Sequence, residues 1–136
     1  MQFYSTNRKT SPVSLREAVV RGLAADRGLF MPEVIRRFPP AFYQNMKEMT
    51  LREISFVVAE AFFGEDVEAG KLKEIVDETL NFDIPLVKVA DNRYSLELFH
   101  GPTLAFKDVG ARFMARLLAY FNKQEGERQV NVLVAT

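Results

Sequence analysis

Within residues 96–112 the spacing of apolar residues changes from every second position to every third or fourth. No other feature of the sequence constrains the fold as strongly. The segment 96–98, Leu-Glu-Leu, alternates apolar and charged residues, which predicts a strand with one face in the core. The next residues with turn chemistry, His-Gly-Pro-Thr at 100–103, are typical of a loop. From residue 105 onwards, apolar positions recur every three or four residues, which predicts a helix that begins near Lys107. The residues on this apolar face are Phe106, Gly110, Phe113, Met114, Leu117, Leu118 and Phe121.

Lys107 would therefore lie at the start of a helix and just beyond a strand, at the sheet edge where open α/β folds bind ligands. The helix macrodipole disfavours an ammonium group at that end. Burial by the apolar neighbours would lower the pKa of the lysine further. A lysine that loses its proton easily can attack aldehydes, including that of pyridoxal phosphate (PLP). Position alone leaves open the alternative of an exposed lysine that lies on the surface beside Asp108. The apolar neighbours are Leu104, Ala105, Phe106 and Val109.

The composition excludes several classes of function. The chain of 136 residues has no Cys and one His, so thiol catalysis, disulfides and multi-histidine or cysteine metal sites are excluded, and we expect no metal. Its 18 basic and 18 acidic residues balance, so we expect no nucleic-acid partner. No apolar run is long enough for a membrane span, and the first residues lack a signal peptide's apolar segment. We therefore expect a cytoplasmic protein.

Residues 1–84 are expected to form a mostly helical amino-terminal domain with short strands. Strands are predicted at 2–6 and 29–31. Ser14 and Glu17 form a capping-box pattern at the start of one helix, and Thr50 and Glu53 repeat this pattern before another helix. A short helix is predicted from 40 to 46, and a further amphipathic helix from 65 to 80.

Residues 85–136 are expected to begin a second, α/β domain with a parallel sheet. Strands are predicted at 86–89 and 94–99 around a turn, followed by the lysine helix and a charged loop. The apolar run at 130–135 is typical of a strand buried on both faces of a parallel sheet. Strand, helix and strand make one crossover unit, but no second helix follows to cover the last strand. We therefore expect a truncated domain that self-associates through 130–135.

The nine residues His-Gly-Pro-Thr-Leu-Ala-Phe-Lys-Asp, at 100–108, resemble the lysine motif of the threonine synthase family. PLP enzymes with the tryptophan synthase β-like fold share its shorter core, Pro-Thr-x-x-Phe-Lys-Asp. Blocks upstream are similar too, although Arg27 stands where many threonine synthases have Gly. The resemblance covers the whole chain and marks it as an amino-terminal fragment. The upstream blocks are Tyr4-Ser5-Thr6 and the residues at 13–18, 22–24 and 28–32.

The resemblance implies that the second domain is a PLP-binding αβα domain and that Lys107 holds PLP as a Schiff base. The parent enzyme would convert O-phospho-L-homoserine and water to L-threonine and phosphate, with Lys107 as the catalytic residue. The glycine-rich loop that cradles the PLP phosphate would follow residue 136, so the fragment is expected to be inactive and without cofactor. The residues expected to shape the loop or orient substrate are His100, Thr103, Phe106 and Asp108. Of these, Phe106 is interpreted as core packing, and Asp108 is expected to fix the loop or cap the helix.

Two alternatives remain open at this point. Enzymes of the threonine dehydratase or cysteine synthase type share the lysine core, but the His-Gly-Pro-Thr context and the upstream blocks favour threonine synthase. Outside enzymes, the chain could serve as a non-catalytic folding or interaction domain, because a lysine without a phosphate site binds an aldehyde weakly.

Overall fold

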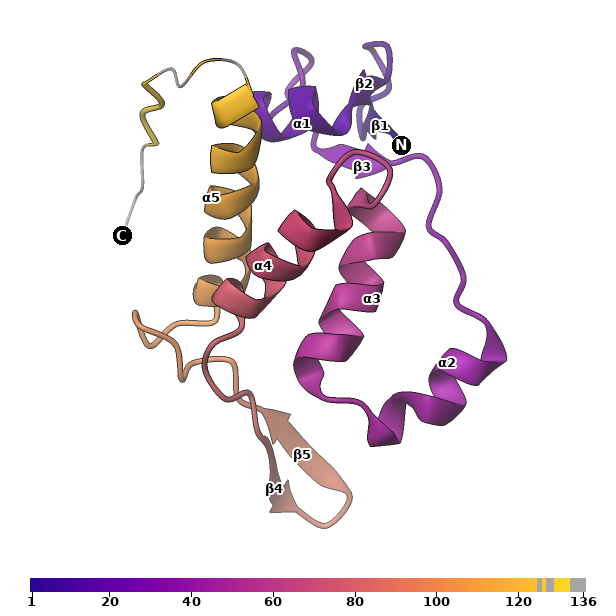
Figure 1. Ribbon diagram of the computed structural model, residues 1–136, viewed down its shortest axis with the longest axis vertical. Helices are drawn as coiled ribbons and strands as arrows, with labels where there is room; N and C mark the ends of the chain where they lie inside the picture. Colours follow the sequence, from indigo (N-terminus) through magenta and orange to yellow (C-terminus); the bar gives the residue numbers. More distant parts are fainter. Residues whose placement is uncertain (125, 127–128, 133–136) are drawn as a thin grey trace.

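The computed structural model describes residues 1–124, 126 and 129–132. Three helices pack together in the middle, with a small sheet and a helix at one end and a hairpin at the other (Figure 1). In chain order the elements are β1 (Gln2–Ser5), β2 (Val13–Ser14), α1 (Leu15–Arg21), β3 (Phe30–Pro32), α2 (Pro40–Asn45), the 3₁₀ helix η1 (Met46–Glu48), α3 (Leu51–Phe63), α4 (Ala69–Thr79), β4 (Leu86–Ala90), β5 (Arg93–Leu96) and α5 (Lys107–Gln124).

The small sheet confirms the two short strands predicted before residue 32. β1 lies in the centre and pairs antiparallel with both β2 and β3, so that Phe3 lies opposite Val13 on one side and Pro32 on the other. α1 begins where the sequence predicts, because the Ser14 side chain accepts a hydrogen bond from the backbone N–H of Glu17. The sheet and α1 together form the end of the molecule next to the amino terminus (Figure 1).

The helices α3 and α4 follow the predicted amphipathic patterns. The capping box at the start of α3 is complete: Thr50 Oγ1 accepts from Glu53 N–H, and the Glu53 carboxylate accepts from Thr50 N–H at 2.7 Å. These hydrogen bonds lower the pKa of Glu53, chiefly through the backbone N–H of Thr50. α4 begins four residues later than predicted, at Ala69, because residues 64–68 form a turn.

This turn binds the amino terminus of the chain. The Met1 ammonium lies 2.9 Å from a Glu65 carboxylate oxygen and 3.0 Å from one of Asp66. Hydrogen bonds to Glu65 and Asp66 raise the pKa of the ammonium above its usual value, and the bond to Glu65 has the larger effect. The first residue of β1 is thereby tied to the segment between α3 and α4.

The core forms around α4. Four residues at helical spacing on α4, from Leu72 to Thr79, are buried, and Leu72 has no exposed surface. α3 and α5 both pack against α4, and Leu117 and Phe121 of α5 join residues of β1 and α1 in the same core. The core therefore draws on both sides of the domain boundary predicted at residue 84, and the division into two domains stays a prediction.

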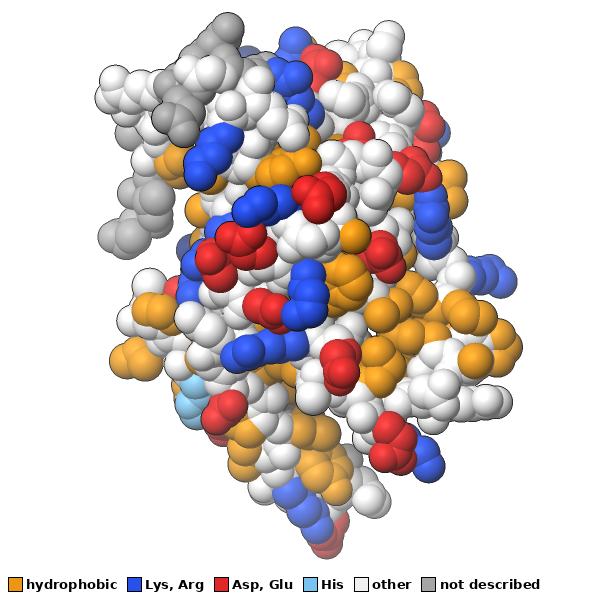
Figure 2. Space-filling view, in the orientation of Figure 1, with side chains coloured by type: hydrophobic (Ala, Val, Ile, Leu, Met, Phe, Trp, Pro, Cys, Tyr) orange, Lys and Arg blue, Asp and Glu red, His pale blue; other side chains and the backbone are white. Residues whose placement is uncertain are grey.

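The hairpin of β4 and β5 corrects the prediction of a buried strand at 94–99. Among the described strands these two pair only with each other, and β5 ends at Leu96, so residues 97–99 are not part of a strand. Leu96 is 58% exposed, and every residue of β4 is exposed on both faces. The alternation of residue types correctly predicted a strand, but the hairpin extends away from the helices (Figures 1 and 2), and none of the described elements covers it.

The parallel sheet predicted for residues 85–136 is not present in the described part of the chain. Both sheets there are antiparallel, and Val130 and Val132 are exposed and outside any strand. A parallel strand needs a neighbour with which to form its ladder, and no described strand lies beside these two valines. The rest of the predicted strand, at 133–135, lies outside the described residues. No helix in the described ranges is long and apolar enough to cross a membrane.

Asp26 connects the loop after α1 to the end of β1. One carboxylate oxygen accepts from the buried Ser5 hydroxyl at 2.6 Å and from Gly28 N–H, while the other accepts from Lys9 N–H at 3.0 Å. The Ser5 hydroxyl is the largest cause of the lowered pKa of Asp26. Gly28 is required here, because a Cβ at this position would lie 2.0 Å from Ser5 Oγ.

We expect Asp26→Asn to lower the urea midpoint of unfolding at pH 7, because an amide cannot accept hydrogen bonds on both of its polar atoms. A lowered folded-state pKa stabilises the fold above the unfolded pKa, and this stabilisation is lost as the pH falls through the folded pKa. The difference between variant and parent should therefore shrink as the pH decreases from 7 towards about 2. A difference that is independent of pH would contradict this role for the carboxylate.

Candidate functional site

The loop before Lys107 is organised by the carboxylate of Asp108. Asp108 is buried, and its Oδ2 accepts a hydrogen bond from the backbone N–H of Thr103 at 2.8 Å. The buried Gly101 lies against the same carboxylate, because a Cβ on residue 101 would be 2.5 Å from Asp108 Oδ2. A residue in the first turn of α5 thus holds the loop that leads into this helix.

In the backbone of this loop, the residue with positive φ is Leu104, at 56°, and not Gly101. Gly101 serves instead for the close approach to Asp108. The left-handed region is unfavourable for leucine, at a cost of about 1 kcal/mol, and here the loop closes through a hydrogen bond from Leu104 N–H to Gly101 O.

Lys107 is the first residue of α5, as predicted, and its side chain is exposed. Within the described residues no hydrogen bond or ion pair engages its amine. The apolar neighbours do not bury the lysine: Leu104 is 77% exposed and Phe106 is 65% exposed, so the exposed alternative holds. The interpretation of Phe106 as core packing is wrong for the same reason: its ring lies on the outside of the loop. The ten residues between the end of β5 and Lys107 also place the lysine farther from a strand than expected.

His100 contacts the residues that follow β5. Its Nε2 lies 2.7 Å from Glu97 Oε2, and its ring contacts that of Phe99 with 4.7 Å between centroids. Thr103 contributes its backbone N–H, not its hydroxyl, to the contact with Asp108. The structure therefore brings Gly101, Thr103 and Asp108 together and leaves His100 and Lys107 with separate surroundings.

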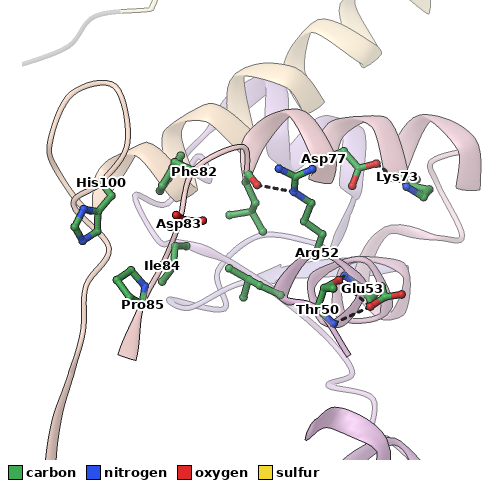
Figure 3. A pocket seen from close by; sticks show the side chains of 12 residues that line it. Thr50, Arg52, Glu53, Lys73, Asp77, Phe82, Asp83, Ile84, Pro85 and His100 are labelled. Carbon is green, nitrogen blue, oxygen red and sulfur yellow. Dashed lines mark hydrogen bonds and ion pairs between the residues drawn. The ribbon is translucent and has the colours of Figure 1, made fainter. Parts of the chain in front are cut away.

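His100 also lines an open hollow of about 1000 Å³ between the start of α3, the end of α4 and the loop (Figure 3). Charges of both signs line it, and several are already engaged: Lys73 pairs with Asp77, and Arg52 Nε donates to the Leu80 carbonyl at 2.9 Å. Lys107 is not among its lining residues. This hollow therefore presents charges of both signs, and Lys107 lies outside it.

Comparison with known proteins assigns the chain to a family. The family model "Threonine synthase N terminus" matches residues 2–80. A threonine synthase from Serratia marcescens is 39% identical over 136 residues, which is 100% of this chain and 31% of the relative. The threonine synthase of Escherichia coli (strain K12) is 35% identical over the same coverage of each chain.

Solved structures agree with the sequence matches. A PLP-bound threonine synthase from Brucella melitensis superposes with a TM-score of 0.88 at 34% identity, covering 94% of this chain and 29% of that one. A threonine synthase from Escherichia coli gives a TM-score of 0.83 at 36% identity, covering 89% of this chain and 28% of that one. The chain spans about 31% of the length of the curated relatives it matches. By family model, sequence and structure, the chain belongs to the threonine synthase family.

Proposed function

We propose that this chain is the amino-terminal part of a threonine synthase and that Lys107 is the residue to which PLP attaches. The observation that carries the proposal is the exposed, unengaged amine of Lys107 at the first residue of α5. An amine in this position can reach an aldehyde without first breaking an ion pair. Lys107 lies beyond residues 2–80 of the family model, but it lies within the matches to relatives that cover the whole chain.

The reaction proposed for the whole protein is the conversion of O-phospho-L-homoserine and water to L-threonine and phosphate. Bound PLP would supply a sink for the electrons released when a substrate proton is removed. The Lys107 amine, once free, would move protons at Cα and Cβ of the substrate as a general base and acid. Asp108 would act indirectly, by holding the loop from Gly101 to Phe106 in the shape that presents Lys107 to solvent.

We further propose that residues 85–136 contribute the first strands and the lysine-bearing helix of the PLP-binding domain. The exposed hairpin supports this proposal, because a two-stranded hairpin with both faces in water is marginal by itself and gains stability when another layer covers it. Gly101, Gly110 and Gly126 are isolated in the sequence, so these residues make no glycine-rich phosphate loop. The chain alone is therefore proposed to hold the lysine without a complete site.

Adding PLP to the chain should produce weak, unsaturable absorbance at about 410–430 nm, because the amine can react but no phosphate site retains the cofactor. Borohydride reduction followed by peptide mass mapping should find label on Lys107, because this amine is exposed and unpaired. A polypeptide extended to the length of the relatives should instead bind PLP saturably.

The matched controls are Lys107→Ala and Lys47→Ala, since Lys47 is also exposed and has only a 3.8 Å contact with Glu48. Loss of the label in the first variant and its retention in the second is the expected pattern. Label distributed over other lysines with none on Lys107 would contradict the assignment, and tight saturable binding to the chain alone would contradict the incomplete site.

Asp108→Asn should lower the free energy of unfolding by about 1–3 kcal/mol, because a buried carboxylate that accepts from Thr103 N–H is replaced by an amide. The control is Asp91→Asn, since Asp91 is fully exposed in the β4–β5 turn and pairs only with Lys88. Urea unfolding measures both variants. Equal effects of the two substitutions would show that Asp108 does not anchor the loop.

We also propose that copies of the chain associate through residues 130–135. Val130 and Val132 support this proposal because both are exposed apolar residues, and residues 133–135 lie outside the described part of the chain. Sedimentation equilibrium should show a mass above that of a monomer, and the double variant Val130→Lys/Val132→Lys should shift the mass toward a monomer. A monomeric unaltered chain at all concentrations would contradict the proposal.

A further inference from the structure

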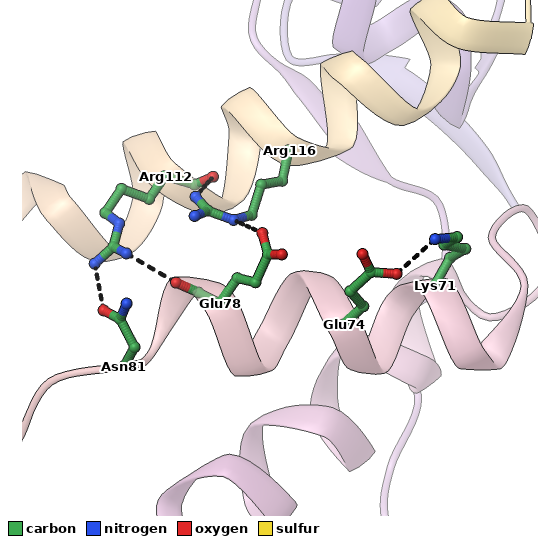
Figure 4. Close-up of polar contacts among 6 residues, drawn as sticks. All are labelled: Lys71, Glu74, Glu78, Asn81, Arg112 and Arg116. Carbon is green, nitrogen blue, oxygen red and sulfur yellow. Dashed lines mark hydrogen bonds and ion pairs between the residues drawn. The ribbon is translucent and has the colours of Figure 1, made fainter.

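Arg112, one and a half turns beyond Lys107 on α5, holds the carboxyl end of α4. Its Nη2 donates to the backbone carbonyl of Glu78 at 2.8 Å, and its Nη1 donates to Asn81 Oδ1 at 2.9 Å (Figure 4). The guanidinium also lies over the Phe82 ring, 5.6 Å from its centroid. The Arg112 side chain thus contacts three residues around the end of α4: Glu78, Asn81 and Phe82.

These contacts supply partners that a helix end lacks. The last carbonyls of a helix have no N–H within the helix, and the helix dipole makes this end negative. Arg112 from α5 serves the Glu78 carbonyl, and Arg52 from α3 serves the Leu80 carbonyl. Arginines from two neighbouring helices therefore converge on one end of α4, and Arg112 couples that end to the helix that begins with Lys107.

Apolar packing holds the two halves of α5 unequally. The fully buried apolar residues of α5, Leu117 and Phe121, both lie in its second half. Under the first half lies an apolar groove of about 340 Å³ between α3, α4 and α5, whose lining includes Val109 and Phe113. Val109 and Phe113 pack against the core but are only partly buried, so the first half of α5 buries less apolar surface than the second. The arginine contacts therefore contribute a larger share at the end of α5 that carries Lys107.

We propose that Arg112 is a positioning residue for Lys107: by fixing the first turns of α5 against the end of α4, it sets where the lysine amine lies. Five residues of helix separate the two side chains by about 7.5 Å along the axis, a length over which a helix is stiff. The part of this proposal that concerns Lys107 chemistry rests on the proposed function. The coupling of α5 to α4 is independent of it.

The test compares Arg112→Met with Arg116→Met. Arg116 is a matched control because it lies one turn further along the same helix and binds the Glu78 side chain, through Nε to Oε2 at 2.7 Å, instead of the backbone at the helix end (Figure 4). Amide hydrogen exchange of residues 109–113 is compared with that of 117–121 in each variant. The pH dependence of PLP–borohydride labelling at Lys107 is measured in parallel.

We expect Arg112→Met to lower protection of 109–113 about tenfold relative to 117–121, since charge-assisted hydrogen bonds are lost, and Arg116→Met to leave this ratio unchanged. The pH at which labelling of Lys107 is half-maximal should shift in Arg112→Met and stay unchanged in Arg116→Met. Arg112→Lys should fail to restore either value, because an ammonium cannot reproduce a planar fork that reaches two acceptors. Asn81→Ala, which removes a single acceptor, should give a smaller change of the same sign.

Uniform loss of protection over both segments in Arg112→Met would overturn the proposal, since it would show a general contribution to stability. An equal effect of Arg116→Met, or full rescue by Arg112→Lys, would overturn it as well. If the unaltered chain takes no label at Lys107, the proposed function fails, and the hydrogen-exchange ratio still decides whether Arg112 holds the start of α5.

Discussion

The burial of one face of α4 is the constraint on which the rest of the structure depends. Leu72, Ile75 and Val76 lie between α3 and α5, and each such side chain contributes about 1.5–3 kcal/mol when removed from water. α3 and α5 each pack against α4, and they also meet through Phe63 and Phe113, whose ring centroids lie 5.4 Å apart. The small sheet and α1 then close the same core through Phe3 and Leu15. Lys107 is placed where it is because α5 must lie along α4.

The described elements show why hydrophobic period predicted the helices better than the strands. A helical period identifies the face that will be buried, and α1, α3, α4 and α5 all bury that face or part of it. Alternation in a strand tells which residues share a face but not what will cover it. Leu96 and Phe99 follow a strand-like pattern and remain exposed, because no described layer lies over them. The start of α4 was misplaced because residues 64–68 form a turn, in which the backbone N–H groups of Asp66 and Val67 both donate to the Phe63 carbonyl.

At the candidate site, turn chemistry and the change of period predicted Lys107 as the first residue of α5, and the structure agrees. The surroundings of the lysine could not be predicted in the same way. Sequence neighbours suggested burial, yet Leu104 and Phe106 point outwards. The contact of Asp108 with Thr103 N–H depends on the fold of six residues, and that of Arg112 with Glu78 O joins residues 34 positions apart. The only sign of the Arg112 contact in the sequence is the pair Arg112 and Arg116, which lie four residues apart on one helix.

The ion pairs of the Met1 ammonium have a practical consequence for anyone who produces this polypeptide. An affinity tag fused at this end, or acetylation of the amine, would convert the ammonium into an uncharged amide and remove the cation that Glu65 and Asp66 share, leaving Glu65 with Arg36. Without this attraction, the contact between β1 and the turn before α4 would weaken. Purification handles for this polypeptide therefore belong at the carboxyl end, with the initiator amine left free.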